Sequence, residues 1–257
     1  MRARKKKALR NSILYILFIL LLSAGAYGYK WIDHFMQERL SDFKLVDIEI
    51  KGNHILSRSD ILSLCGLQPG EGRLLAVKPA LVEEKLRESH YIKAVSVVRS
   101  LPSKLRITVL EREPIAFIHG KGMNLIDEEG YLMSVPARRI RWNLPHIIGI
   151  KESLGKLGEK TTSAQAMKGV EIVAHMRMTP SALNEIVSDI DFSHRDYLCL
   201  RLTRGGTEVR IEEHNYALNL FILRQYLEKY LQWDDLNIIK YVDVRFNNQL
   251  VYKEKQG

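Results

Sequence analysis

Residues 98–116 have the sequence VRSLPSKLRITVLEREPIA, and this stretch decides the fold of the domain around it. From 105 to 109, apolar residues alternate with polar ones, which is the period of a strand with one buried face. The LPS sequence at 101–103 is typical of a turn, and residues 95–98 form an apolar-rich segment before it. The stretch therefore predicts an antiparallel hairpin.

A small domain can be predicted outward from this hairpin, toward the N-terminus. Residues 45–52 alternate like a strand and end at a Gly-Asn turn. A capping-box sequence at 57–60 starts a short helix that Gly66 ends. A second helix, with proline in its first turn, spans residues 79–89. The predicted order is β-α-α-β-β, within a domain bounded at residues 45–113.

The chain from residue 114 to 250 predicts a second domain, of α+β class and rich in strands. Alternating segments joined by turns indicate the strands, and apolar residues at helical spacing indicate two helices, the first capped by Thr161 or Thr162. The expected strands are 115–118, 123–126, 131–135, 186–192, 197–203, 208–212 and 241–246, and the expected helices are 162–175 and 216–231. Residues 251–257 are expected to be a charged tail.

Three stretches resemble sequences of one known family. Residues 98–116 resemble the V-x-R-x-x-P-x-x-L-x-I-x-V-x-E-R-x-P-x-A signature of a POTRA domain, in the form carried by the FtsQ/DivIB family of bacterial cell-division proteins. Residues 125–130 (LIDEEG) resemble the D-x-x-G hairpin of that family, and residues 241–246 (YVDVRF) resemble its Y-V-D-L-R-Y strand. The resemblance implies a POTRA domain at 45–113 and an FtsQ-type β domain at 114–250.

An uncharged apolar segment, residues 13–29, precedes both domains. At about 1.5 Å per residue, a helix of this length can just cross a hydrocarbon core of roughly 30 Å. Because Lys and Arg beside a transmembrane helix stay on the cytoplasmic side, the basic tail, residues 1–12, predicts a cytoplasmic N-terminus. Residues 30–44 would form a juxtamembrane stalk. The cations that carry this topology signal are Arg2, Arg4, Lys5, Lys6, Lys7 and Arg10.

The same apolar segment is also compatible with a cleaved secretory signal peptide. It has a basic start, an apolar centre and an Ala-x-Ala sequence at 24–26, where a signal peptidase could cut. Apolar and aromatic residues continue past this point to Phe35, as in an interfacial aromatic belt followed by a continuing helix. We therefore expect an uncleaved anchor.

The charge of the chain is mostly a property of its N-terminus. The sequence has 39 basic and 30 acidic residues, a net charge of +9. Six basic residues and no acid lie in the first 29 positions, which leaves 33 basic and 30 acidic residues in the rest. The charge therefore does not indicate nucleic-acid binding. Cys65 and Cys199 fall in different predicted domains and are expected to be buried free thiols.

The common sequence motifs for catalysis and for metal binding are absent from the chain. The sequence has no H-E-x-x-H, no C-x-x-C, no G-x-S-x-G and no phosphate-binding glycine loop. His194-Arg195-Asp196 matches the start of a kinase catalytic loop, but the Asn required five residues after the Asp is Arg201. The sequence therefore predicts no catalytic residue, no metal ligand and no cofactor.

The family resemblance implies a non-enzymatic scaffold in the inner membrane at the division septum, with periplasmic domains that bind FtsB and FtsL. It also implies a partner site on the C-terminal strand, where an exposed edge can bind by strand addition. Alternation would bury the valines of 241–246 and leave Arg245 accessible, with the direction of Phe246 open. The residues expected to bind the partner are Tyr241, Asp243, Arg245, Phe246, Asn247, Gln249, Val251 and Tyr252.

Two other classes of protein remain as alternatives. A secreted or envelope-assembly POTRA protein, acting as a chaperone or docking module, would need signal cleavage or a long series of amphipathic barrel strands. After residue 114 the predicted strands are too few for a barrel, and two helices interrupt them. An enzyme acting on peptidoglycan is the third class, and the sequence offers no motif for it.

Overall fold

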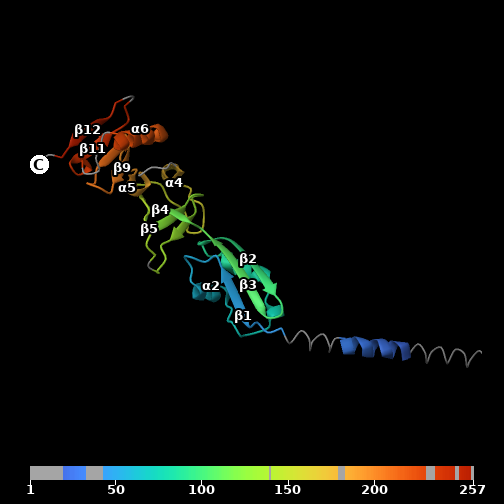
Figure 1. Ribbon diagram of the computed structural model, residues 1–257. Coiled ribbons are helices and arrows are strands. Elements are labelled where there is room, and N and C mark those ends of the chain that lie inside the picture. The colour runs from blue at the N-terminus through green and yellow to red at the C-terminus, as the bar shows by residue number, and fades with distance from the viewer. Residues whose placement is uncertain are drawn as a thin grey trace, which may run out of the picture.

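The computed structural model describes residues 20–32, 43–138, 140–178, 183–229, 235–246 and 249–255. Most of them form two units in succession, each with its own sheet and its own apolar core (Figure 1). The predicted α+β class is confirmed, with a small first unit and a strand-rich second unit.

The first unit is a three-stranded sheet packed against two helices. Its central strand β3 (Lys104–Glu111) runs parallel to β1 (Asp47–Lys51) and antiparallel to β2 (Ile92–Ser100). Between β1 and β2 lie α2 (Arg58–Cys65), the 3-10 helix η1 (Leu74–Ala76) and α3 (Pro79–Arg87). The predicted β-α-α-β-β order is therefore confirmed.

Local sequence sets the ends of these helices. The Ser57 hydroxyl accepts a hydrogen bond from the Asp60 N–H, and the Asp60 carboxylate accepts one from the Ser57 N–H, which completes the predicted capping box. Gly66 ends α2 in the left-handed conformation, with a φ of 66°. Pro79 is the first residue of α3, a position where its missing N–H leaves no helical hydrogen bond unmade.

The core of the first unit lies between its sheet and its helices. Leu105, Ile107 and Val109 of β3 are buried, and the residues between them are exposed, as the alternation predicts. Cys65 lies in this core, whereas Cys199 lies on a strand of the second unit, and both are buried free thiols as expected. Burial raises the thiol pKa to about 11 for Cys65 and to about 12 for Cys199.

In the described residues, the second unit is a nine-stranded sheet with three α-helices. Its strand order is β12-β11-β10-β9-β8-β7-β4-β5-β6. The strands are β4 (Pro114–His119), β5 (Met123–Asp127), β6 (Leu132–Ser134), β7 (His146–Ile148), β8 (Val187–Asp191), β9 (Leu198–Leu202), β10 (Glu208–Ile211), β11 (Ile239–Asp243) and β12 (Val251–Glu254). The helices are α4 (Ala164–Met178), α5 (Leu183–Ile186) and α6 (Tyr216–Lys229), and the 3-10 helix η2 (Asp235–Asn237) precedes β11.

Two rows of side chains cross this sheet from strand to strand. The apolar row, packed against the helices, consists of register partners: Ile118, Ile147, Ile190, Leu200, Val209 and Val242. The row beside it, which we call the polar row, consists of Phe117, His146, Asp189, Arg201, Glu208, Tyr241 and Lys253. Because neighbouring residues of a strand point to opposite faces, the helices cover one face and the polar row lies on the other.

Helix α4 is capped by a residue that sequence analysis did not choose. The Ser163 hydroxyl accepts the Ala166 N–H at 3.0 Å, so Ser163 is the cap in place of Thr161 or Thr162. The Thr161 hydroxyl is buried and donates to the Leu154 carbonyl at 2.8 Å. The hydroxyl of Thr161 is therefore engaged by the preceding loop, and the hydroxyl of Ser163 is the one that caps the helix.

The two units meet at a packed junction. Arg112, just after β3, donates to the Asp127 carboxylate at 2.7 Å, and its guanidinium lies 3.6 Å from the centre of the Tyr131 ring. Leu125 and Met133 belong to the second sheet but lie in the core of the first unit. The junction therefore combines a shared apolar surface with a nearly buried ion pair.

Residues 20–32 form a helix, which overlaps the predicted membrane segment at 13–29 (Figure 1). Residues 13–19, the six N-terminal cations and most of the expected stalk at 30–44 lie outside the described residues. Among the helices of the described ranges, none combines the length and the apolar character that crossing a membrane requires.

Candidate functional site: the C-terminal sheet edge

The C-terminal edge of the second sheet is formed by β12, which pairs antiparallel with β11. The Lys255 N–H donates to the Ile238 carbonyl at 2.7 Å, so the backbone of residue 255 points toward β11. Because backbone groups alternate along a strand, the N–H and C=O groups of Tyr252 and Glu254 point outward. Within the ranges that the structure describes, no strand pairs with this outer edge.

This arrangement corrects two expectations about the C-terminus. The strand β11 is not the edge of the sheet, because it lies between β10 and β12. Residues 251–257 were expected to be a charged tail, but Val251–Glu254 form β12. All four residues of β12 are exposed, so the strand is held in place by main-chain pairing with β11. Because none of its side chains is buried, the sequence shows no alternation of buried and exposed residues that would predict a strand here.

Arg245 follows β11 and is held by a carboxylate two residues before it. Its Nε donates to Asp243 Oδ1 at 2.9 Å, and its Nη2 donates to Asp243 Oδ2 at 2.7 Å, which makes a bidentate pair. Its Nη1 donates to the Asp196 carbonyl oxygen at 3.3 Å. Asp243 is only 4% exposed, so the expectation that it lies on an accessible face is wrong. The alternation rule missed this because Arg245 turns back over Asp243.

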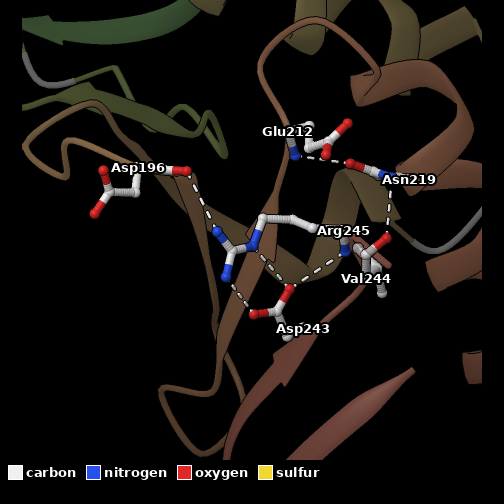
Figure 2. A network of polar contacts seen from close by, with 6 residues as sticks. All are labelled: Asp196, Glu212, Asn219, Asp243, Val244 and Arg245. Atoms are coloured by element: carbon white, nitrogen blue, oxygen red, sulfur yellow. Dashed lines mark hydrogen bonds and ion pairs between the residues drawn. The ribbon is translucent and has the colours of Figure 1, made fainter. Parts of the chain in front are cut away.

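Figure 2 shows how this ion pair is tied to helix α6 and strand β10. The buried side chain of Asn219, on α6, accepts the Glu212 N–H at 2.7 Å and donates to the Val244 carbonyl at 3.0 Å. The Val244 N–H in turn donates to the Arg210 carbonyl at 3.1 Å. The chain therefore stays attached to β10 for one residue beyond the end of β11, which fixes the position of Arg245.

Burial and ion pairing act in opposite directions on Asp243. Burial alone would raise the pKa of its carboxyl, but hydrogen bonds from the Arg245 side chain and backbone, with the charges of Arg245 and Arg210, hold the pKa below its ordinary value. The same pairing raises the pKa of Arg245. Both groups are therefore charged at neutral pH, and the pair is a fixed feature of the surface.

Aromatic rings and guanidinium groups alternate beside the pair. Arg210 lies 3.8 Å from the centre of the Tyr241 ring and 4.9 Å from that of Tyr197. Arg245 lies 5.1 Å from the centre of the Tyr197 ring and 5.9 Å from that of Phe246. Each such contact contributes about 0.5 to 1 kcal/mol at an exposed site. The contacts stiffen a surface that carries positive charge next to exposed rings.

Exposed apolar side chains surround the free edge. Phe246 is 48% exposed, Val251 41% and Tyr252 51%. Phe246 therefore faces outward, because β11 ends at Asp243 and strand alternation no longer applies to residue 246. Of the other expected partner-binding residues, Gln249 is exposed, Tyr241 is half-buried and Asn247 lies outside the described residues.

Three residues of this site were not singled out by sequence analysis: Tyr197, Arg210 and Asn219. The register places Arg210 directly beside Asp243 on the neighbouring strand. That pairing joins residues more than thirty positions apart, so no local pattern could have indicated it. A buried asparagine within an apolar helical stripe was the one available signal, because such a side chain needs hydrogen-bond partners.

Among the described residues, no group of three or more His, Cys, Asp or Glu side chains is placed to hold a metal ion. The kinase-like sequence at 194–196 lies in the connection between β8 and β9, where His194 stacks on Tyr197 with ring centres 4.5 Å apart. Its residues serve the packing of a surface loop.

Comparison with known proteins gives two family matches and several relatives. Residues 43–112 match the family described as POTRA domain, FtsQ-type, and residues 116–245 match the family described as cell division protein FtsQ/DivIB, C-terminal. Three similar proteins, each called cell division protein FtsQ, come from Geotalea daltonii, Koribacter versatilis and Rhodothermus marinus. The Geotalea protein is 25% identical, over 82% of this chain and 76% of its own length. The Koribacter protein is 27% identical, over 96% of this chain and 71% of its own length. The Rhodothermus protein is 22% identical, over 98% of this chain and 90% of its own length.

Proposed function

Because the chain belongs to the FtsQ/DivIB family of cell division proteins, we propose that it is a non-enzymatic scaffold of the division machinery at the septum. In this proposal, residues 13–29 anchor the chain in the inner membrane, with a cytoplasmic N-terminus and both folded units in the periplasm. The scaffold binds the FtsB and FtsL pair and links early to late division proteins. The apolar segment and the six preceding cations support the topology.

The partner site in this proposal is the outer edge of β12. The observation that carries it is the edge itself: outward N–H and C=O groups at Tyr252 and Glu254, with no strand of the described ranges beside them. An added strand would take its affinity from main-chain hydrogen bonds at these residues. Its specificity would come from the exposed Phe246, Val251 and Tyr252 and from the remaining donors of Arg245.

A single substitution can remove one outward N–H and leave the pairing with β11 unchanged. Glu254→Pro does this, because the N–H of residue 254 points outward and proline is tolerated on an edge strand in that orientation. Glu254→Thr is the matched control, since it removes the same charge and keeps the N–H. Both variants keep Lys255, whose N–H binds the Ile238 carbonyl.

The full-length variants in detergent would be titrated with a peptide from the periplasmic end of FtsB. We expect Glu254→Pro to weaken binding about fivefold, the effect of one lost hydrogen bond of about 1 kcal/mol, and Glu254→Thr to bind like the parent protein. Equal affinity of the proline and threonine variants would place the partner elsewhere. Absence of binding to the parent protein would reject FtsB as the partner.

A further inference from the structure

Two histidines form a direct hydrogen bond on the polar face of the second sheet. His119 is the last residue of β4 and His146 is the first residue of β7, which runs parallel to it. His119 Nε2 and His146 Nδ1 are 2.9 Å apart, and the ring centres are 5.2 Å apart. Both side chains are half-buried. The pair therefore links two strands through a side-chain hydrogen bond.

The protonation of this pair decides whether the bond exists. A neutral imidazole offers one N–H and one lone pair, so a neutral pair or a singly protonated pair can share a proton between the two nitrogens. When both rings are protonated, all four nitrogens carry hydrogen and no acceptor is left. Two positive charges then face each other at hydrogen-bond distance, and the contact becomes repulsive.

The pair fastens a segment that reaches the other unit. Phe117 stacks on His146 with ring centres 4.8 Å apart. Trp142 and Phe117 pack in a T-shaped arrangement with ring centres 6.2 Å apart. Phe117, Trp142 and Leu144 also pack against the core of the first unit. The segment 140–146 therefore runs from that core to His146 at the start of β7. There its end is held by main-chain pairing with β4 and β8, which includes a 2.9 Å hydrogen bond from the Phe117 N–H to the Pro145 carbonyl, and the imidazole pair adds a side-chain link to β4.

The charged residues near the pair lie on β8, on β9 and on the segment itself. Asp189, on β8, is the strand neighbour of His146, and Arg201, on β9, lies 4.0 Å from Asp189. Arg141, on the segment itself, is exposed, and the partner of His119 on β5 is the uncharged Met123. Burial lowers the pKa of His146, and the charge of His119 lowers it further, while Asp189 opposes both. The pKa of His146 in the folded protein therefore lies below the ordinary value of 6.5, so the folded protein binds a proton at His146 less readily than the unfolded chain does. The contribution of neutral His146 to the stability of the fold is present above pH 6.5 and is lost as the pH falls below it.

We propose that His119 and His146 form a proton-operated clasp, which steadies the side chains of segment 140–146 at the junction of the two units and loosens them when both rings are protonated. The fold of each unit persists in the loosened state, since each has its own core and β7 keeps its main-chain pairing. Repulsion between the rings loosens the packing of Trp142 and Phe117, and with it the fixed orientation of the units. The clasp thereby makes the geometry of the scaffold sensitive to the acidity around it.

Trp142 is a built-in reporter of the clasp. The chain has three tryptophans, so the full-length protein in detergent with Trp31→Phe and Trp233→Phe keeps Trp142 alone. Acrylamide quenching of its fluorescence would be measured from pH 8 to pH 5. We expect quenching to rise at least twofold as pH falls below about 6.5, with an unchanged far-ultraviolet circular dichroism spectrum.

Two variants separate the clasp from a general effect of acid. In His119→Gln the amide can hydrogen-bond to residue 146 in either protonation state, so the rise in quenching should be absent. His214→Gln removes an exposed histidine on another loop and should keep the rise. If His119→Gln alters the spectrum, His146→Gln replaces it. A constant signal in the parent protein, or an unchanged rise when either clasp histidine is replaced, would overturn the proposal.

Discussion

Replacing Arg245 tests whether its main role is to neutralise Asp243. Arg245→Met removes the guanidinium and keeps an apolar stem of similar length. The substitution leaves a carboxylate that is only 4% exposed without its two strongest donors. Breaking a buried ion pair typically costs about 3 to 5 kcal/mol. The Arg245 side chain is 24% exposed, so in the variant water can partly take over its hydrogen bonds to Asp243. We therefore expect the free energy of unfolding to fall by about 2 to 4 kcal/mol.

The two cysteines allow the loss to be measured for each unit separately. Pulse alkylation in increasing urea, with each cysteine quantified by mass spectrometry, follows unfolding of the second unit at Cys199 and of the first unit at Cys65. We expect the Cys199 transition of Arg245→Met to move to lower urea. The Cys65 transition serves as the internal control and should move less.

A second variant isolates the charge interaction. Asp243→Asn keeps the shape of the side chain and removes its charge, so Arg245→Met in that background should cost less by about 1 to 3 kcal/mol. The pH dependence has a defined sign. In the parent protein the lowered pKa of Asp243 contributes stability that is present above the ordinary value and lost as pH falls through the lowered pKa. Without Arg245, burial raises that pKa, so the gap between the two proteins is widest at neutral pH and narrows in acid.

Two results would refute this argument. One is a cost below about 0.5 kcal/mol at pH 7, which is the size expected for a surface pair. The other is a cost that does not change between pH 7 and pH 3. Strand alternation alone makes Arg245 accessible, and a substitution at an accessible position is expected to leave folding intact. The pairing with Asp243 predicts instead a destabilised second unit. A binding assay on the edge site should therefore use exposed positions such as Phe246 or Tyr252.

Ile107→Asp would bury an unpaired carboxylate at a fully buried position of β3, at a cost of several kcal/mol of stability. Cys65 should then react with alkylating reagent in native buffer while Cys199 stays protected. Continued protection of Cys65 would contradict the assigned core of the first unit. Replacing Arg4, Lys5, Lys6 and Lys7 by Glu should impair or invert insertion of a reporter fused after Gly257, which is expected to be active only when exported; an unchanged reporter would mean that another signal orients the chain.

Much of the fold followed from local patterns. The hairpin at 98–116 was predictable because its two strands are joined by a short turn and its buried face alternates through Leu105, Ile107 and Val109. The capping box at Ser57 and the glycine at 66 bounded the first helix for the same reason, since the groups that interact lie within a few residues. The valines of 241–246 are buried as predicted, because Val242 lies inside β11 and Val244 still bonds to β10 through its N–H.

The candidate site was only partly predictable. The segment 241–252 was chosen from its resemblance and its alternation, and the structure places most of its described residues at the C-terminal edge of the sheet. Burial of Asp243 could not be derived, because it depends on Arg245 turning back over it. Exposure of Phe246 could not be derived either, because β11 ends at Asp243 and alternation no longer applies there. The strand β12 was missed, because an edge strand of exposed residues needs no apolar pattern.

The sequence by itself determined the order of elements in the first unit, the buried faces of single strands and helices, and the family, since each depends on residues close together in the chain. Tertiary structure alone decided which strand forms the edge, that Arg245 closes over Asp243, and that His119 meets His146. These features depend on the pairing of distant strands. A shift of register by one residue would turn every side chain of a strand to the opposite face, so nothing short of the assembled sheet specifies them.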